Sequence, residues 1–84
     1  MTNSEPVALA DEAPSAEDLT AYDKVHLTEY LRLLDACAAG ASESEMARLI
    51  LGIDPDKEPE RALRAVASHL RRARWMSERG YQRL

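Results

Sequence analysis

The spacing of apolar residues constrains the fold of this chain more than any other feature. In three stretches, at residues 23–39, 42–51 and 60–79, apolar side chains recur three and four positions apart, as they do on one face of an α-helix. A glycine follows each stretch, at Gly40, Gly52 and Gly80, where helices commonly end. Because no stretch alternates apolar and polar residues as a half-buried strand does, we predict an all-α protein.

Each predicted helix contributes one face to a shared core. Ser42 and Glu45 form a capping box that begins the second helix, and Pro59 suits the first turn of the third. The expected core consists of Leu27, Tyr30, Leu31, Leu34 and Ala38 from the first helix, Met46, Leu49 and Ile50 from the second, and Leu63, Val66, Ala67, Leu70 and Ala73 from the third.

The 84 residues suffice for a single domain. Residues 1–21 are rich in Ala, Ser, Pro and acidic residues and contain no basic one, so we expect a flexible, disordered acidic tail. Residues 22–84 would then form the folded domain, a small three-helix core of helix-turn-helix type. A unit of roughly sixty residues buries a small core, which leaves little room for an enclosed active site.

Several classes of function lack the residues that they require. Cys37 is the only cysteine, so no internal disulfide can form, which fits a reducing compartment. His26, Cys37 and His69 do not have metal-ligand spacing, and no catalytic set or phosphate-binding glycine loop is present. The N-terminus does not resemble a signal peptide, and no apolar run could span a membrane. We therefore expect a cytoplasmic protein with no enzymatic activity, cofactor, metal or membrane partner.

Charge is distributed unevenly along the chain, whose net charge is −4. Residues 1–60 hold fourteen acidic residues against four basic ones, a balance of −10. Residues 61–84 hold seven arginines against one glutamate, a balance of +6. Such a split is informative about binding partners.

The second and third predicted helices have the order of a helix-turn-helix motif. The segment "SEMARLILGID" is followed by a longer basic helix that contains "RAVASHLRRAR". Helix-turn-helix motifs usually join their helices by three or four residues, whereas "DPDKEPE" inserts several more. We therefore predict a variant with an extended turn.

The third helix carries a basic face that has two interpretations. At about 100° per residue, four arginines fall on one side of this helix with Ser68 and Trp75: Arg61, Arg64, Arg71 and Arg72. They could form a stripe that binds phosphate. Alternatively, they could be a solvated face on which Glu60 pairs with Arg64.

Acidic residues at the start of the third helix favour protein recognition over DNA binding. A helix-turn-helix domain presents this end of its recognition helix to DNA. Carboxylates there would repel the phosphate backbone: Asp54, Asp56, Glu58 and Glu60. We therefore expect no DNA partner, and four residues are candidates for a protein contact, although each could equally belong to the core: Leu33, Cys37, Trp75 and Tyr81.

The stretch from Tyr22 to Leu84 resembles a proteobacterial family. The similarity covers "YDKVHLTEYLRLLDACAAGASESEMARLILGIDPDKEPERA" and "SHLRRARWMSERGYQRL", and "ARWMSERGY" is its most specific piece. The family is a domain of unknown function that ends transcription activators of conjugative elements, and it is understood as an extended-turn helix-turn-helix. A short acidic copy without the activators' N-terminal domain resembles the QseM-type antiactivators of rhizobial symbiosis islands.

The resemblance implies a function through protein partners. Such an antiactivator would bind an FseA-like activator through the activator's N-terminal domain. It would also sequester a TraR-like quorum-sensing regulator of the LuxR type, and so hold off horizontal transfer of the integrative and conjugative element. We expect it to be monomeric when free. The alternative is a DNA-binding repressor or antitoxin-like regulator that uses the arginine-rich third helix.

Overall fold

The computed structural model describes residues 9–84, and within this part of the chain every regular element is a helix. The elements are α1 (Ala21–Val25), α2 (Leu27–Ala38), α3 (Glu43–Met46), the π-helix η1 (Ala47–Leu51), α4 (Pro59–Glu78) and the 3₁₀ helix η2 (Gly80–Arg83). The prediction of an all-α protein is confirmed.

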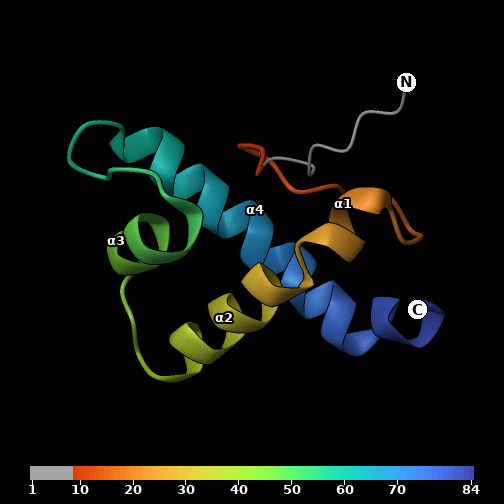
Figure 1. Cartoon of the computed structure of the whole chain (residues 1–84). Coiled ribbons are helices and arrows are strands. Elements are labelled where there is room, and N and C mark those ends of the chain that lie inside the picture. The colour runs from red at the N-terminus through yellow and green to blue at the C-terminus, as the bar shows by residue number, and fades with distance from the viewer. Residues whose placement is uncertain (1–8) are drawn as a thin grey trace.

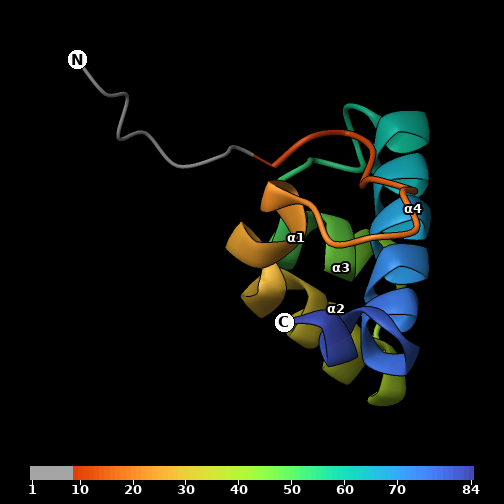
Figure 2. The same cartoon turned by 90° about the vertical axis from the view of Figure 1, so that its right-hand side faces the viewer.

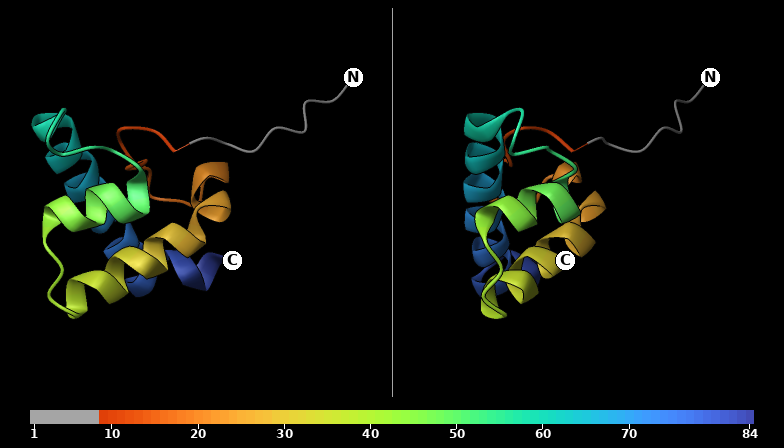
Figure 3. Two further views of the ribbon diagram at one scale, coloured as in Figure 1. Left: turned by 60° about the vertical axis from the view of Figure 1, so that its left-hand side comes forward. Right: turned by 90° about the vertical axis from the view of Figure 1, so that its left-hand side faces the viewer.

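The longest helix, α4, packs against all the other main helices. It contacts α2 most extensively, and it also contacts α3 and η1. Figure 2 shows α4 along one side of the molecule and α1, α2 and α3 together on the opposite side of the molecule. In Figure 3, α3 and η1 lie over α2, to which a short loop joins them. The predicted three-helix core therefore corresponds to α2, the α3–η1 pair and α4.

The core divides into two clusters. The larger one lies between α2, the α3–η1 pair and the first half of α4, and its buried residues are Leu33, Met46, Ala47, Leu51, Ile53, Ala62, Ala65, Val66 and Leu70. The smaller one lies towards the end of α4 and contains Tyr30, Ala73 and Met76. Burial of these apolar groups provides the main favourable contribution to folding.

The predicted helix boundaries that rest on local signals are confirmed. The Ser42 side chain accepts a hydrogen bond from the Glu45 backbone, and the Glu45 side chain accepts one from the Ser42 backbone. Gly52 ends η1 with φ of 71°, in the left-handed region that favours glycine. Pro59 occupies the first turn of α4.

The first predicted helix is wrong in part, because it is divided at His26. There the backbone leaves the helical region, with φ of −108° and ψ of 25°, and α1 ends before α2 begins. Thr20 caps α1 through a reciprocal pair of hydrogen bonds with Asp23. No glycine or proline marks this break, so the local pattern did not predict it.

Part of the predicted core is also wrong. Leu31, Leu49 and Leu63 are 63%, 68% and 51% exposed, whereas Leu33 is fully buried. Ala38 and Ala67, also expected in the core, are exposed. The second helix changes from α to π geometry after Met46. A π-helix has more residues per turn than an α-helix, so η1 turns Ala47 and Leu51 inward in place of Leu49.

Residues 9–20, here called the N-terminal strap, lie beside α4 (Figures 1 and 2). The strap runs in the same direction as the helix, because Asp11 contacts Arg61 and Ala13 contacts Ser68 further along. A flexible tail was predicted over residues 1–21, and residues 1–8 of this range lie outside the described part of the chain. The composition of the strap did not reveal its contacts, because they depend on residues about fifty positions away.

None of the helices in residues 9–84 is both long enough and apolar enough to cross a membrane.

Candidate nucleic-acid interface

The exposed side of α4 carries three arginines at helical spacing. Arg64, Arg71 and Arg74 are exposed, and among the described residues no carboxylate forms an ion pair with any of them. We call these three residues the basic stripe. Arg61 lies at its edge with a side chain that is 44% exposed. Positions 64, 71 and 74 fall on one face because the spacings are close to whole turns of an α-helix.

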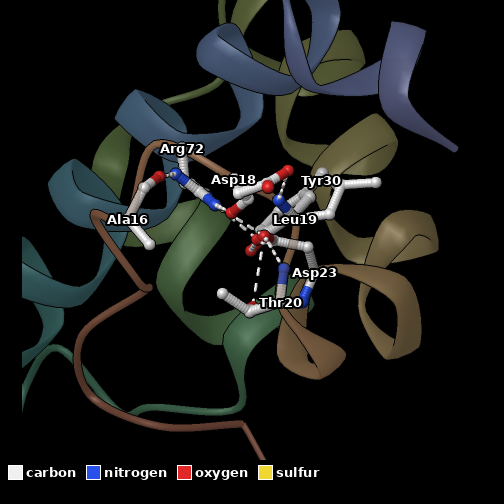
Figure 4. A network of polar contacts seen from close by, with 7 residues as sticks. All are labelled: Ala16, Asp18, Leu19, Thr20, Asp23, Tyr30 and Arg72. Atoms are coloured by element: carbon white, nitrogen blue, oxygen red, sulfur yellow. Dashed lines mark hydrogen bonds and ion pairs between the residues drawn. The ribbon is translucent and has the colours of Figure 1, made fainter.

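Arg72 does not belong to this surface, which corrects the predicted basic face. It is only 4% exposed, and its guanidinium faces Asp23, which is fully buried. Two of its nitrogens donate hydrogen bonds to the Asp23 carboxylate at 2.9 Å and 2.6 Å. It also donates to the backbone carbonyls of Ala16 and Asp18, at 2.6 Å and 3.0 Å (Figure 4). We call this pair and its partners the buried anchor.

The buried anchor is fully hydrogen-bonded. Asp23 also accepts a hydrogen bond from the Tyr30 hydroxyl at 2.7 Å and from the Thr20 backbone at 3.0 Å. Burial alone would raise the pKa of Asp23, but the bonds from Arg72, Tyr30 and Thr20 lower this pKa to about 2. Burial and the neighbouring Asp23 raise the pKa of Tyr30. The anchor therefore keeps Asp23 ionised and Tyr30 protonated over the ordinary pH range.

Ser68, expected beside the arginines on the basic face, is buried under the strap. Its hydroxyl accepts a hydrogen bond from the Ala13 backbone at 3.1 Å. Trp75 is half-buried, and the Arg72 guanidinium lies 3.8 Å from the centre of its ring. Glycine is required at position 80, because a Cβ atom there would lie against the Trp75 ring and 2.7 Å from the Met76 sulfur.

His69 is a buried structural histidine. Its Nδ1 lies 2.7 Å from the Ala65 carbonyl, which can only accept, so Nδ1 carries the proton. Its Nε2 then accepts a hydrogen bond from the Tyr22 hydroxyl at 2.6 Å, and this hydroxyl accepts from the Ala10 backbone at 3.0 Å. Burial lowers the pKa of His69. The neutral ring thus links α4, α1 and the strap.

The acidic cluster at the start of α4 is largely paired. Arg48 lies 3.8 Å from Asp54 and 3.2 Å from Asp56, and Arg61 lies 2.9 Å from Glu58. Glu60 is exposed in the first turn of α4. The predicted repulsion treated four free carboxylates, but three of them share two arginines, Arg48 and Arg61, so their negative charge is offset in part. Sequence reasoning missed Arg48 because it lies on η1, eight residues before Asp56.

The residues predicted to contact a protein partner do not form one surface. Leu33 is fully buried in the larger cluster, and so it cannot face a partner in this structure. Cys37 is half-buried, with its sulfur 3.6 Å from an Arg74 nitrogen. Tyr81 is 60% exposed on η2 and lines an apolar pocket with Met76 and Ser77 of α4.

Sequence reasoning also missed Arg74 as a member of the exposed face. The predicted face was centred on the side that the strap covers, and Arg74 lies beyond it. Its signal was present, since Arg74 follows Arg71 by three positions. Among residues 9–84 no three histidine, cysteine or acidic side chains are grouped so that they could hold a metal ion.

The fold and this surface define a regulator domain of helix-turn-helix type, in which α3 and η1 precede the long basic helix α4. Residues 5–84 match the family described as "RovC_DNA-bd: T6SS, Transcription factor, DNA binding domain". The chain belongs to this family. No curated protein matches the chain.

This family membership overturns the expectation that the chain has no DNA partner, because the family is one of DNA-binding domains. The expectation failed on electrostatics: it counted the carboxylates at the start of α4 without the cations that pair with them. The description of the family mentions neither antiactivation nor conjugative elements nor quorum sensing. The FseA-like and TraR-like partners stay predictions of the resemblance.

Proposed function

We propose that this chain is a DNA-binding transcriptional regulator that places α4 against duplex DNA, with the basic stripe towards the phosphates. One observation carries the proposal: three exposed arginines, with no acidic partner in the described part of the chain, lie on one face of the helix that a helix-turn-helix domain uses for recognition. Membership in a family of DNA-binding domains supports it. This was the alternative interpretation of the sequence.

The net charge of −4 does not oppose this proposal. Contacts with phosphate depend on the local surface, because charges beyond about 10 Å are largely screened at 0.1 M salt. At the start of α4, ion pairs with Arg48 and Arg61 offset part of the charge of three carboxylates. Arg64, Arg71 and Arg74, which form no ion pair within residues 9–84, lie further along the helix.

The proposal is tested by titrating the protein into a fluorescent DNA duplex of about 20 base pairs at low and at moderate salt. The logarithm of the binding constant should fall linearly with the logarithm of salt concentration, because each arginine on a phosphate releases counterions. In Arg64→Ala/Arg71→Ala the slope should decrease in magnitude by about 2, since each phosphate contact contributes about 0.9.

A matched control removes two positive charges elsewhere. Lys24→Ala/Arg32→Ala changes the net charge equally, but Lys24 lies on α1 and Arg32 on α2. This control should keep the wild-type slope. The proposal is wrong if wild-type protein does not bind the duplex, or if both double variants weaken binding equally. Recognition of a protein partner would then be the function to pursue.

A further inference from the structure

The strap places acidic residues beside the arginines of α4. Residues 9–20 carry four acidic side chains and no basic one: Asp11, Glu12, Glu17 and Asp18. Asp11 accepts a hydrogen bond from Arg61 at 2.8 Å. Asp11 and Glu12 line a shallow pocket with Arg61 and Arg64.

The second half of the strap encloses more of the same helix. Residues 13–17 form one wall of a cleft of about 340 Å³, and the other wall comes from α4 and the residue after it. That wall includes Arg71, Trp75 and Arg79, and Glu17 faces into the cleft from the strap. The strap therefore presents carboxylates along the flank of α4, where a phosphate backbone would present its own negative charges.

The two halves of the strap are held with different strength. Residues 16–20 are attached to the buried anchor, through the Ala16 and Asp18 carbonyls and the Thr20 cap (Figure 4). Residues 10–13 are held by one exposed ion pair and by backbone hydrogen bonds to Tyr22 and Ser68. Leu9, just before them, packs against the larger core cluster. Exposed ion pairs contribute little to stability. Residues 10–13 can therefore move away from α4 while Leu9 before them and the buried anchor after them stay in place.

We propose that residues 10–13 of the strap are an autoinhibitory segment that competes with DNA phosphate for Arg61 and Arg64. This inference rests on the proposed function. In the closed state Asp11 occupies Arg61 and Glu12 adds negative charge beside Arg64. Duplex DNA binds once residues 10–13 have left α4, and the buried anchor keeps the strap attached. The measured DNA affinity is then the affinity of the open state multiplied by the fraction of molecules in which the strap is open.

The test compares DNA affinity in two variants of equal charge. Asp11→Asn/Glu12→Gln removes the acidic side chains of the strap, and it should bind the duplex about 2- to 5-fold more tightly than the control, since that is the range of an exposed ion pair. The control, Glu29→Gln/Asp35→Asn, removes two carboxylates from α2. Equal affinity of the two variants would overturn the proposal.

A second measurement follows the strap directly. The Ala13 amide is bonded to Ser68 in the closed state, so its hydrogen exchange in the wild-type protein should accelerate when the duplex is added. Unchanged protection of Ala13 in the DNA complex would overturn the proposal. The two hypotheses fail differently: strap failure leaves salt-dependent binding through Arg64 and Arg71 intact, whereas failure of the proposed function abolishes that dependence.

Discussion

Arg71 and Arg72 are neighbours in the chain, yet they lie in opposite environments. Arg71 is exposed on α4, whereas Arg72 is buried and donates four hydrogen bonds to the strap and to Asp23. The two flanks of one helix therefore perform different tasks, one facing solvent and the other holding the N-terminal part of the domain. The comparison teaches that a run of arginines cannot be assigned to one function before it is known which chain segments cover it.

The largest expected effect separates these two neighbours. Arg72→Ala leaves Asp23 as a buried, unpaired charge, so the free energy of unfolding should fall by about 3–5 kcal/mol. Arg71→Ala should change it by about 0.5 kcal/mol or less. Urea unfolding followed by circular dichroism measures both. Arg72→Lys, which keeps the charge, serves if Arg72→Ala does not fold. Similar losses for positions 71 and 72 would contradict the comparison.

Acid should destabilise, in two stages, the side of α4 that packs against α1 and the strap. His69 folds in its neutral form with a lowered pKa, so stability is lost as the pH falls below about 6.5 towards the folded pKa. Asp23 has an ordinary pKa of 3.8 and a folded pKa of about 2. Its contribution is complete above 3.8, and about 2 kcal/mol should be lost as the pH falls to about 2.

Denaturant unfolding at a series of pH values checks both stages. The lower stage should move to higher pH in Arg72→Lys, because the weaker partner lowers the pKa of Asp23 by less. A stability profile that stays flat from pH 7 to pH 2 would show that neither group is coupled to folding.

A smaller effect is expected where the strap meets α4. Ser68→Ala removes the acceptor for the Ala13 amide, so the free energy of unfolding should decrease by about 1 kcal/mol. Hydrogen exchange of the Ala13 amide should increase at the same time. Ser77→Ala is a matched control, because its hydroxyl bonds only within α4, to the Arg74 carbonyl. An equal effect of the two substitutions would mean that the strap contact adds no stability.

The parts of the fold that were predictable from the sequence depend on neighbouring residues. Ser42 and Glu45 begin a helix together, and Gly52 and Pro59 mark an end and a beginning. These signals act within one or two turns, so the sequence shows them directly. The all-α class and the extended turn follow from the same local patterns.

The parts that were not predictable depend on residues far apart. Arg72 resembled a phosphate-binding residue because Asp23, its partner, lies 49 positions earlier. Leu49 was predicted to lie in the core because its spacing fits an α-helix. It is exposed, because the π-helix turns its neighbours inward instead. The acidic cluster resembled a barrier to DNA because its ion pairs with Arg48 depend on the path of the turn, which helical spacing does not show. Helical spacing places side chains on a face, but it does not show what covers that face.

The separation between Arg72 and Asp23 has a consequence for the order of folding. Closing a loop of about fifty residues costs more conformational entropy than forming the local contacts within and between adjacent helices. We therefore expect α3, η1 and α4, which are adjacent in the chain, to assemble first and the guanidinium to meet its carboxylate late, after the rate-limiting step. Losing this contact would then shorten the lifetime of the native protein while leaving its refolding rate nearly the same.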